Sequence, residues 1–274
     1  MAGTLYLVAT PIGNLEDITH RALRILGESG LIACEDTRRT RRLLDHYEIR
    51  TPLVSYHEYN EAARSGELVD RLRRGGNVAL VSDAGTPLIS DPGYRLVAKA
   101  VAEGIRVEPV PGACASVTAL SASGLPADSF HFAGFLPAKA SRRRATLAGL
   151  RDIAATLVFY EAPHRILAAL EDIEAILGPR PVVLAREVTK IHEEFLRGTA
   201  AEVARTLQAR PTIKGEITLV VGRASAGGPD ETPLDRAVQE LVESGVSRMD
   251  AIKAVARRRG LAKREVYKAL ERGG

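Results

Sequence analysis

Asp83 is the residue whose type and setting first suggest a ligand site. It follows the apolar run Val78 to Val81, which predicts a strand buried on both faces of a parallel sheet. In open α/β sheets ligands lie at the carboxyl ends of strands, and the nearby Gly85 lets backbone approach a ligand closely. We therefore predict a binding loop here. The alternative is an ordinary strand-to-helix loop in which Asp91-Pro92-Gly93 caps the next helix.

Titratable and cationic side chains also follow other apolar runs of the chain. A carboxylate, lysine or histidine in such a position can accept a proton, and an arginine can hold a phosphate. Each of them can equally be a helix cap or half of an internal ion pair, and both interpretations stay open. The residues concerned are Glu35, Asp36, Arg38, Glu161, His164, Arg165, Arg186, Glu187 and Lys190.

Short apolar runs alternate with helical patterns along residues 1–223. This alternation predicts an α/β fold with two α/β domains, residues 1–122 and 123–223, that meet near Gly124-Leu125-Pro126. The first predicted strand, Thr4 to Ala9, leads into a loop with a single glycine, so the sequence carries neither a dinucleotide fingerprint nor a P-loop there. The other strands are expected at 31–34, 54–56, 78–81, 105–110, 130–135, 156–160, 181–185, 195–198 and 216–222.

The C-terminal part of the chain differs in composition. Residues 224–232 are rich in small residues with a Gly-Gly-Pro step, which predicts a linker. Residues 233–274 predict a small helical, helix-turn-helix-like domain, with helices at 234–243, 248–258 and 263–271. From Arg248 to Arg272 there are nine basic and three acidic residues. This excess predicts a polyanionic partner.

Two more basic clusters, Arg38 to Arg42 and Arg142 to Arg144, support the same prediction, although solvated helix faces are the alternative for any one of them. The 274 residues are 45% hydrophobic and 26% charged, as in a soluble globular protein, and no apolar run approaches the roughly 18–20 residues of a membrane span. Cys34 and Cys114 stand apart in apolar or small-residue surroundings. We therefore expect a cytoplasmic protein with no membrane association and no structural metal.

Several long motifs resemble those of one protein family. They are similar to the motifs of the bacterial ribosomal RNA small subunit methyltransferase I family, in the tetrapyrrole methylase-like superfamily. The likeness runs from Thr4 to about Gly222, and the basic tail resembles the helical C-terminal domain of the same proteins. One departure is Ala113, where the family more often has proline. The motifs are Ala9-Thr-Pro-Ile-Gly-Asn-Leu-Glu-Asp-Ile18, Cys34-Glu-Asp-Thr-Arg38, Leu80 through Gly93, Phe159-Tyr-Glu-Ala-Pro-His-Arg165 and Leu184-Ala-Arg-Glu-Val-Thr-Lys190.

The resemblance implies two α/β domains of the tetrapyrrole methylase type with S-adenosylmethionine (S-adenosyl-L-methionine) held in the cleft between them. It also implies a homodimer that methylates the 2′-oxygen of a cytidine ribose near the decoding centre of 16S rRNA. Carried over by position, the cofactor contacts are Pro11, Ile12, Gly13, Asp83, Gly85, Thr86, Ser116, Val117, Tyr160, Ala185, Lys214, Gly215 and Glu216.

Such a transfer needs little covalent help from the protein. A sulfonium methyl group is already activated, so the enzyme has to align it with the 2′-oxygen while a base or a cation assists the weakly acidic hydroxyl. Under the resemblance we expect Glu161, Glu187 and Lys190 in that catalytic role, with Glu35 and Asp36 as further candidates. The expected RNA contacts are Arg38, Arg39, Arg41, Arg42, Arg142, Arg143, Arg144, Arg165, Arg257, Arg258, Arg259, Lys263 and Arg264.

Two alternatives belong to other functional classes. A methylase of small tetrapyrroles would use the same cofactor, but it has no need of a polycationic rim. A nucleic-acid-binding protein without catalysis would use the α/β part as a scaffold, but the polar loops at several strand ends argue against it.

Overall fold

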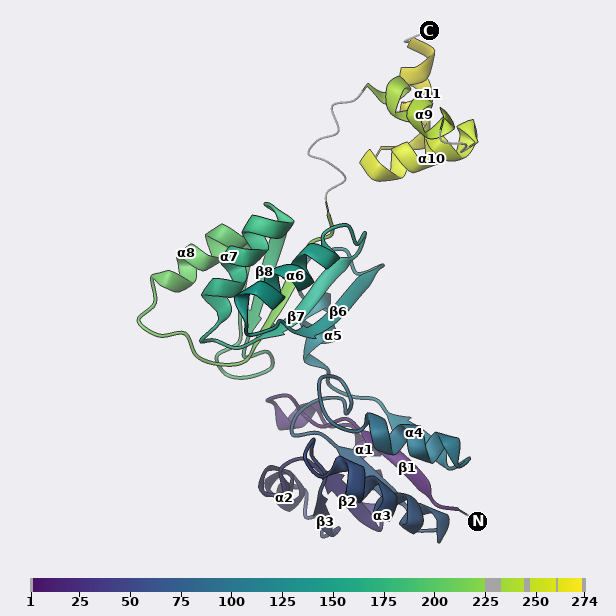
Figure 1. Cartoon of the computed structure of the whole chain (residues 1–274), viewed down its shortest axis with the longest axis vertical. Helices are drawn as coiled ribbons and strands as arrows, with labels where there is room; N and C mark the ends of the chain where they lie inside the picture. The colour runs from purple at the N-terminus through teal and green to yellow at the C-terminus, as the bar shows by residue number, and fades with distance from the viewer. Residues whose placement is uncertain (1, 225–232, 244–246, 260, 273–274) are drawn as a thin grey trace. The chain divides into compact units, whose positions relative to one another are not determined.

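The computed structural model describes residues 2–224, 233–243, 247–259 and 261–272 (Figure 1). The chain forms two compact units, residues 1–223 and residues 224–274. The larger unit holds two five-stranded sheets and their helices, and the described part of the smaller unit is helical.

The first sheet is parallel throughout, with strand order β3-β2-β4-β1-β5. All five carboxyl ends therefore meet at one edge, as a sheet built from strand–helix–strand units requires. The strands are β1 (Thr4–Val8), β2 (Leu31–Cys34), β3 (Leu53–Ser55), β4 (Val78–Val81) and β5 (Arg106–Val110). The helices are η1 (Leu15–Asp17), α1 (His20–Glu28), α2 (Thr37–His46), α3 (Glu61–Arg73) and α4 (Tyr94–Ala102).

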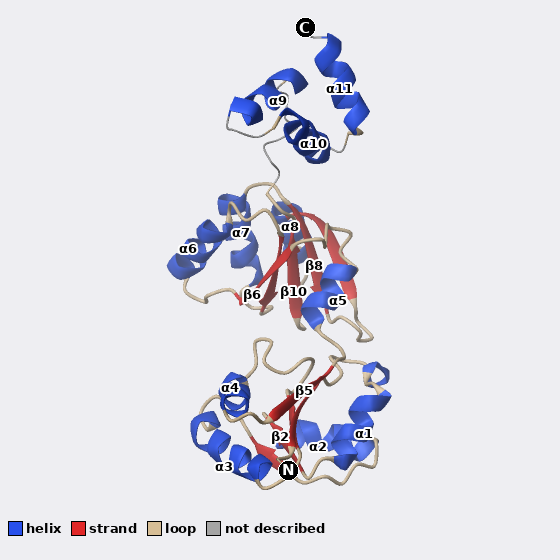
Figure 2. Ribbon diagram, turned by 90° about the vertical axis from the view of Figure 1, so that its right-hand side faces the viewer, coloured by secondary structure: helices blue, strands red, loops and turns tan. Residues whose placement is uncertain are grey.

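Alternate residues of these strands enter two separate cores, because successive side chains of a strand point to opposite faces. Leu80 packs with Leu68 and Leu96 of α3 and α4, whereas its neighbour Val81 packs with Leu26 and Leu44 of α1 and α2. Helices thus cover both faces of the sheet (Figure 2). This explains why the strands read as continuous apolar runs.

The second sheet is mixed, with strand order β6-β7-β10-β8-β9. β6 and β7 are parallel, whereas β10 runs antiparallel to both of its neighbours, β7 and β8. Consequently β10 begins at the edge where β7 and β8 end. The strands are β6 (Phe130–Phe135), β7 (Thr156–Glu161), β8 (Pro181–Arg186), β9 (Glu194–Thr199) and β10 (Ile217–Val221). The helices are α5 (Ala115–Ser121), α6 (Ala140–Leu150), α7 (Ile166–Leu177) and α8 (Ala200–Gln208).

Three features of the local structure differ from, or add to, what the sequence led us to expect. Helix α5, which the boundary after residue 122 assigned to the first domain, packs its buried Ala119 and Leu120 against the second sheet. Asp91 does not cap α4; the cap position is Gly93, without a side-chain hydrogen bond. Helix α2 was not expected. Its sequence is dominated by arginines, and it buries only Thr40 and Leu44, so it has no clear apolar periodicity.

Arg143 was predicted to contact RNA, but it lies in the interior. Its guanidinium binds the Asp172 carboxylate of α7 at 2.7 Å, and the two side chains are only 6% and 4% exposed. Arg144 binds the other oxygen of the same carboxylate at 2.6 Å with a side chain that is 65% exposed. Arg143 therefore fastens α6 to α7 and is withdrawn from the expected RNA contacts.

The smaller unit has an apolar core of its own. Its helices are α9 (Leu234–Glu243), α10 (Arg248–Arg259) and α11 (Lys263–Arg272). Val238, Ile252 and Val266 bring one buried side chain from each helix into one cluster. Ser247 caps α10, because its hydroxyl accepts from the Asp250 amide and donates to the Asp250 carboxylate. Among all the residues described, no helix combines the length and apolarity needed to cross a membrane.

Asp172 and its exposed partner Arg144 give a matched pair of variants for a stability measurement. Asp172→Ala should leave Arg143 buried without its partner and lower the free energy of unfolding by about 3–5 kcal/mol. Arg144→Ala removes an exposed partner of the same carboxylate and should cost at most about 1 kcal/mol. Chemical denaturation of both variants measures the difference, and similar small losses in the two would contradict a buried pair that fastens α6 to α7.

Candidate active site at the strand ends

A cavity of about 350 Å³ lies where strand ends of both sheets converge. The first sheet contributes the loops after β1, β4 and β5, and the second contributes the ends of β6 and β7, the loop after β8 and the start of β10. The antiparallel direction of β10 is what brings its first residues to this edge. The lining residues are Ile12, Arg39, Asp83, Ala84, Gly85, Thr86, Ile89, Ser90, Asp91, Cys114, Ala115, Phe135, Tyr160, Glu161, Ala162, Pro163, Val188, Gly215, Glu216, Ile217 and Thr218.

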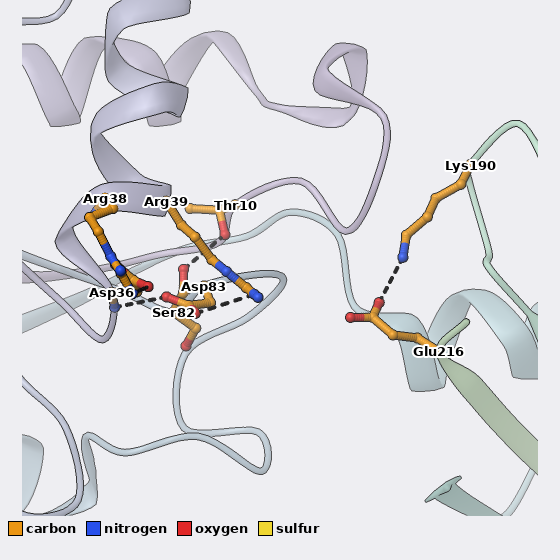
Figure 3. A network of polar contacts seen from close by, with 8 residues as sticks. All are labelled: Thr10, Asp36, Arg38, Arg39, Ser82, Asp83, Lys190 and Glu216. Atoms are coloured by element: carbon orange, nitrogen blue, oxygen red, sulfur yellow. Dashed lines mark hydrogen bonds and ion pairs between the residues drawn. The ribbon is translucent and has the colours of Figure 1, made fainter. Parts of the chain in front are cut away.

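Asp83 joins three segments at the carboxyl edge of the first sheet. Its Oδ1 accepts from the Asp36 amide at 2.9 Å, and its Oδ2 lies 3.4 Å from Arg39 Nη1 (Figure 3). The preceding Ser82 accepts, through its carbonyl, a hydrogen bond of 3.2 Å from the Thr10 hydroxyl. These bonds tie the loops after β1, β2 and β4 together, so Asp83 is held in place on the cavity wall.

Two half-buried carboxylates, Asp83 and Asp91, lie on this wall, and Glu35 lies close enough to interact with both. Burial raises the pKa of Asp91, and the negative charge of Asp83 raises it further. Burial also raises the pKa of Glu35, again with contributions from Asp83 and Asp91, against opposing effects of Arg39 and His57. The negative charge of Asp83 thus makes the ionisation of Asp91 and Glu35 less favourable. A cation in the cavity would reverse this effect.

Asp36, in contrast, is not poised to accept a proton. Hydrogen bonds from the side chain and backbone of Arg38 lower its pKa to about 2. Its Oδ1 also accepts from the Arg38 amide at 2.8 Å, which caps α2. The capping alternative therefore describes Asp36 better than a catalytic role does.

Glu161 is the buried carboxylate on the opposite wall. Its side chain is 1% exposed, and its Oε1 accepts from Arg165 Nη2 at 2.6 Å and from the Ala162 amide at 2.8 Å. Its Oε2 has no hydrogen-bond partner among the residues described. A buried acceptor left without a donor is costly, so a ligand that donates a hydrogen bond or carries positive charge would stabilise it. Arg165, an expected phosphate ligand, is engaged with this carboxylate instead.

Two contacts join the first sheet's loops to the second sheet at the cavity. Ile12, in the loop after β1, packs in one cluster with Val183, Val188 and Val220. The Tyr160 hydroxyl accepts a hydrogen bond of 3.2 Å from the Ser116 amide at the start of α5. These contacts fix both walls of the cavity within one compact unit.

Glu187 and Lys190 lie in the loop after β8, outside the cavity lining. Lys190 Nζ donates to Glu187 Oε1 at 2.8 Å and to Glu216 Oε2 at 3.0 Å, the latter drawn in Figure 3. A hydrogen bond from Lys190 lowers the pKa of Glu187, so that carboxylate is a weak proton acceptor. Although burial opposes it, the hydrogen bonds with the two glutamates raise the pKa of Lys190. The geometry thus favours a positioning role for both residues.

The same loop approaches two predicted cofactor segments closely. A Cβ atom added at Gly13 would lie 2.3 Å from Lys190 Cγ, so the lysine stem covers that glycine. Gly215 has φ of +96°, and a Cβ atom there would lie 2.5 Å from Glu187 Cγ. Only glycine fits this position without strain.

The structure brings many of the predicted cofactor residues to the cavity. Those on its lining are Ile12, Asp83, Gly85, Thr86, Tyr160, Gly215 and Glu216. Those outside the lining are Pro11, Gly13, Ser116, Val117, Ala185 and Lys214. Sequence reasoning missed lining residues such as Asp91, Cys114, Phe135 and Thr218. The sequence around Asp91 does not identify it as a lining residue, because an aspartate before Pro-Gly is equally typical of a helix cap.

The expected RNA contacts have different settings. Arg38, Arg39 and Arg42 are exposed on α2, whereas Arg41 is half-buried. Arg142 is exposed on α6, and Lys263 and Arg264 are exposed on α11. The side chains of Arg257, Arg258 and Arg259 lie outside the described residues. Within the part of the chain that the structure describes, no group of three His, Cys, Asp or Glu residues could hold a metal ion.

Comparison with known proteins identifies relatives along nearly the whole chain. The family model of Tetrapyrrole (Corrin/Porphyrin) Methylases matches residues 4–204. The chain is 52% identical over 272 residues to Ribosomal RNA small subunit methyltransferase I of Halalkalibacterium halodurans, covering 97% of this chain and 93% of the relative. It is 46% identical over 275 residues to the protein of the same name from Escherichia coli O157:H7, covering 99% and 96%.

Solved structures share the fold of the larger unit. Uroporphyrin-III-C-methyltransferase from Thermus thermophilus superposes with a TM-score of 0.58 at 25% identity, covering 81% of this chain and 95% of that one. A diphthine synthase gives a TM-score of 0.61 at 15% identity, covering 80% and 90%. At that identity the second likeness concerns the fold alone.

The raised pKa of Asp91 predicts that its ionised carboxylate lowers the stability of the folded protein. Folding raises the pKa of Asp91 above its ordinary value of 3.8. The contribution of Asp91 to the free energy of unfolding is therefore most favourable below pH 3.8 and is lost as the pH rises through the raised pKa. Asp91→Asn should therefore raise the free energy of unfolding at neutral pH, with a gain that shrinks as the solution is acidified. Urea denaturation at several pH values measures this, and a pH-independent loss of stability would contradict it.

Proposed function

Because this chain belongs to the ribosomal RNA small subunit methyltransferase I family of the tetrapyrrole methylases, we propose that it is an S-adenosylmethionine-dependent methyltransferase acting on the 2′-oxygen of a cytidine ribose in 16S rRNA. The observation that carries the proposal is the carboxylate-lined cavity at the strand ends, most of whose lining lies within residues 4–204, the region that the family model matches. We further propose, from the resemblance, that the target lies near the decoding centre and that the protein acts in the cytoplasm.

The residues present fit S-adenosylmethionine. A volume of about 350 Å³ falls within the roughly 300–1,000 Å³ of small-molecule sites. The walls carry Asp83, Asp91 and the unpartnered Oε2 of Glu161, which suits a ligand with positive charges on sulfur and on its amino group. When bound, S-adenosylmethionine supplies an activated methyl group on a positively charged sulfur.

The chain's own residues have the task of binding and orienting. We assign the cofactor to the lining formed by Ile12, Asp83, Gly85 and Thr86 on one wall and by Tyr160, Gly215 and Glu216 on the other. Thr86 is oriented by its hydrogen bond of 3.0 Å to the Ala113 carbonyl, and Ile12 supplies an apolar surface that excludes water.

Among the predicted catalytic residues, Glu161 has the setting that suits proton transfer best. Its Oε1 is saturated by Arg165 and the Ala162 amide, so Oε2 is the oxygen free to accept a proton from the ribose hydroxyl. Glu187 and Lys190 would act indirectly, by holding Glu216 and the turn at Gly215 against the cavity.

RNA would be held by basic surface around and beyond the cavity. Arg38 and Arg42 are exposed cations on α2, and Arg39 of the same helix lines the cavity beside Asp83. Lys263 and Arg264 are exposed cations on α11 in the smaller unit. Phosphate contacts of this kind position the RNA without reading its sequence. We also propose that the protein is a homodimer; the exposed Phe130 on the edge strand β6 is the kind of apolar edge that a second copy could cover.

Transfer of a radiolabelled methyl group tests the proposed function directly. The purified chain should label 16S rRNA in small ribosomal subunits that lack the modification, and nuclease digestion should release a 2′-O-methylcytidine. Label on a base instead of a ribose, or transfer only to a tetrapyrrole such as uroporphyrinogen, would contradict the proposal.

Glu161→Gln keeps the size of the side chain and removes the proton acceptor. The single-turnover rate should fall by roughly 100- to 10,000-fold, the usual contribution of a general base, while the affinity for S-adenosylmethionine changes much less. Rapid-quench assays with saturating RNA give the rate and calorimetry gives the affinity. An unchanged rate would remove Glu161 from catalysis, and a loss confined to affinity would make it a cofactor ligand only.

A further inference from the structure

A second hollow, of about 470 Å³, lies between α3 and α4. The two helices pack side by side over the same face of the first sheet (Figure 2). Most of its lining residues have small side chains, which leave the space between the two helices unfilled. The hollow is therefore an open groove on the surface of the helix pair. The small residues are Ala62, Ser65, Ala98 and Ala102.

The charge of this groove suits an anionic occupant. Arg95 and Lys99 line it, one helical turn apart, and its lining among the described residues includes no carboxylate. Arg95 Nε contacts Glu61 Oε1 at 2.8 Å, which links the first turns of the two helices, yet the arginine stays largely exposed. Cations one turn apart along a groove match successive phosphates of a nucleic-acid backbone.

Two exposed aromatic rings stand at the end of the groove that faces the strand ends. Tyr94, the first residue of α4, lines the groove and is 75% exposed, and Tyr59, just before α3, is 95% exposed. They are the most exposed aromatic side chains in the described part of the chain. Flat rings beside cations are the usual platform for stacking unpaired bases.

The turn that carries Tyr59 is held rigidly. The Asn60 side chain accepts from the His57 amide at 2.9 Å and donates to the Ser55 carbonyl at 3.2 Å. The buried Tyr56 anchors the same turn, because its hydroxyl contacts Ser65 at 3.0 Å. A ring presented from a fixed turn loses little entropy when a base stacks on it.

The groove begins at the edge of the first sheet where the cavity lies, because α3 and α4 start after the carboxyl ends of β3 and β4. Tyr94 follows Asp91, a cavity-lining residue, by three positions. On the Tyr59 side, the ring centroid of His57 lies 6.2 Å from that of Tyr59, and His57 is close enough to Glu35 to affect its pKa electrostatically. A strand of RNA with one nucleotide in the cavity would therefore meet these rings next.

We propose that the α3–α4 groove binds a single-stranded segment of the RNA substrate adjoining the target nucleotide. Bases stack on Tyr94 and Tyr59, and phosphates contact Arg95 and Lys99. This inference rests on the proposed function for the identity of the substrate, but RNA binding by the groove can be measured without turnover.

The test uses the full-length chain, a single-stranded RNA oligonucleotide and the small ribosomal subunit. Tyr94→Ala should weaken oligonucleotide binding and raise the KM for the subunit by roughly 5- to 150-fold, whereas Tyr94→Phe, which keeps the ring, should stay near wild type. Lys99→Ala should lower the salt slope of binding by about 0.7. Arg106→Ala is the matched control, because Arg106 is an exposed cation at the opposite, amino-terminal end of β5.

The affinity for S-adenosylmethionine should be the same in all four variants. Oligonucleotide binding by Tyr94→Ala and Lys99→Ala that equals that of Arg106→Ala would overturn the proposal. A changed molecular mass in solution with an unchanged salt slope would assign the groove to a contact between copies of the chain and would also overturn it. If the wild-type chain transferred no methyl group, that result would count against the proposed function alone, because oligonucleotide binding reports on the groove separately.

Discussion

The electrostatic cost of gathering carboxylates around one cavity is the constraint on which the site depends. The half-buried Asp83 and Asp91 stand on one wall and the buried Glu161 on the other. Burial raises the pKa of Asp91 and the negative charge of Asp83 raises it further, while one oxygen of Glu161 has no hydrogen-bond donor among the described residues. Arg39 and Arg165 offset part of this negative charge, and a positively charged ligand such as a sulfonium cofactor would offset more of it.

The rest of the larger unit supplies the geometry that holds these charges together. A parallel sheet brings the ends of β1, β4 and β5 to one edge, and the antiparallel β10 brings its own beginning to the ends of β7 and β8. Ile12 and the Tyr160–Ser116 hydrogen bond then join the two sheets beside the cavity. The charged groups thus stand on a strand end (Glu161) or on loops that directly follow strands, so that rigid strands determine their positions.

The strands and the loops at their ends were predictable because a doubly covered sheet imposes uninterrupted apolar runs, and Asp83 stands two residues after such a run. Features that depend on contacts between residues far apart in the sequence could not be predicted in this way. Nothing local distinguishes the buried Arg143 from the exposed Arg144, because the partner of both, Asp172, lies in another helix. The packing of α5 on the second sheet and the direction of β10 depend likewise on tertiary structure. Family resemblance supplied the substrate and cofactor, which apolar patterns cannot specify.

Calorimetric titration of S-adenosylmethionine into the wild-type chain and the Asp83→Asn variant tests the central claim, that the carboxylates of the cavity hold a cationic cofactor. Asparagine keeps an oxygen able to accept the Asp36 amide, so the loop has reason to stay folded while the charge is lost. The account predicts that the variant binds more weakly by about 1–3 kcal/mol. A folded variant with wild-type affinity would contradict it.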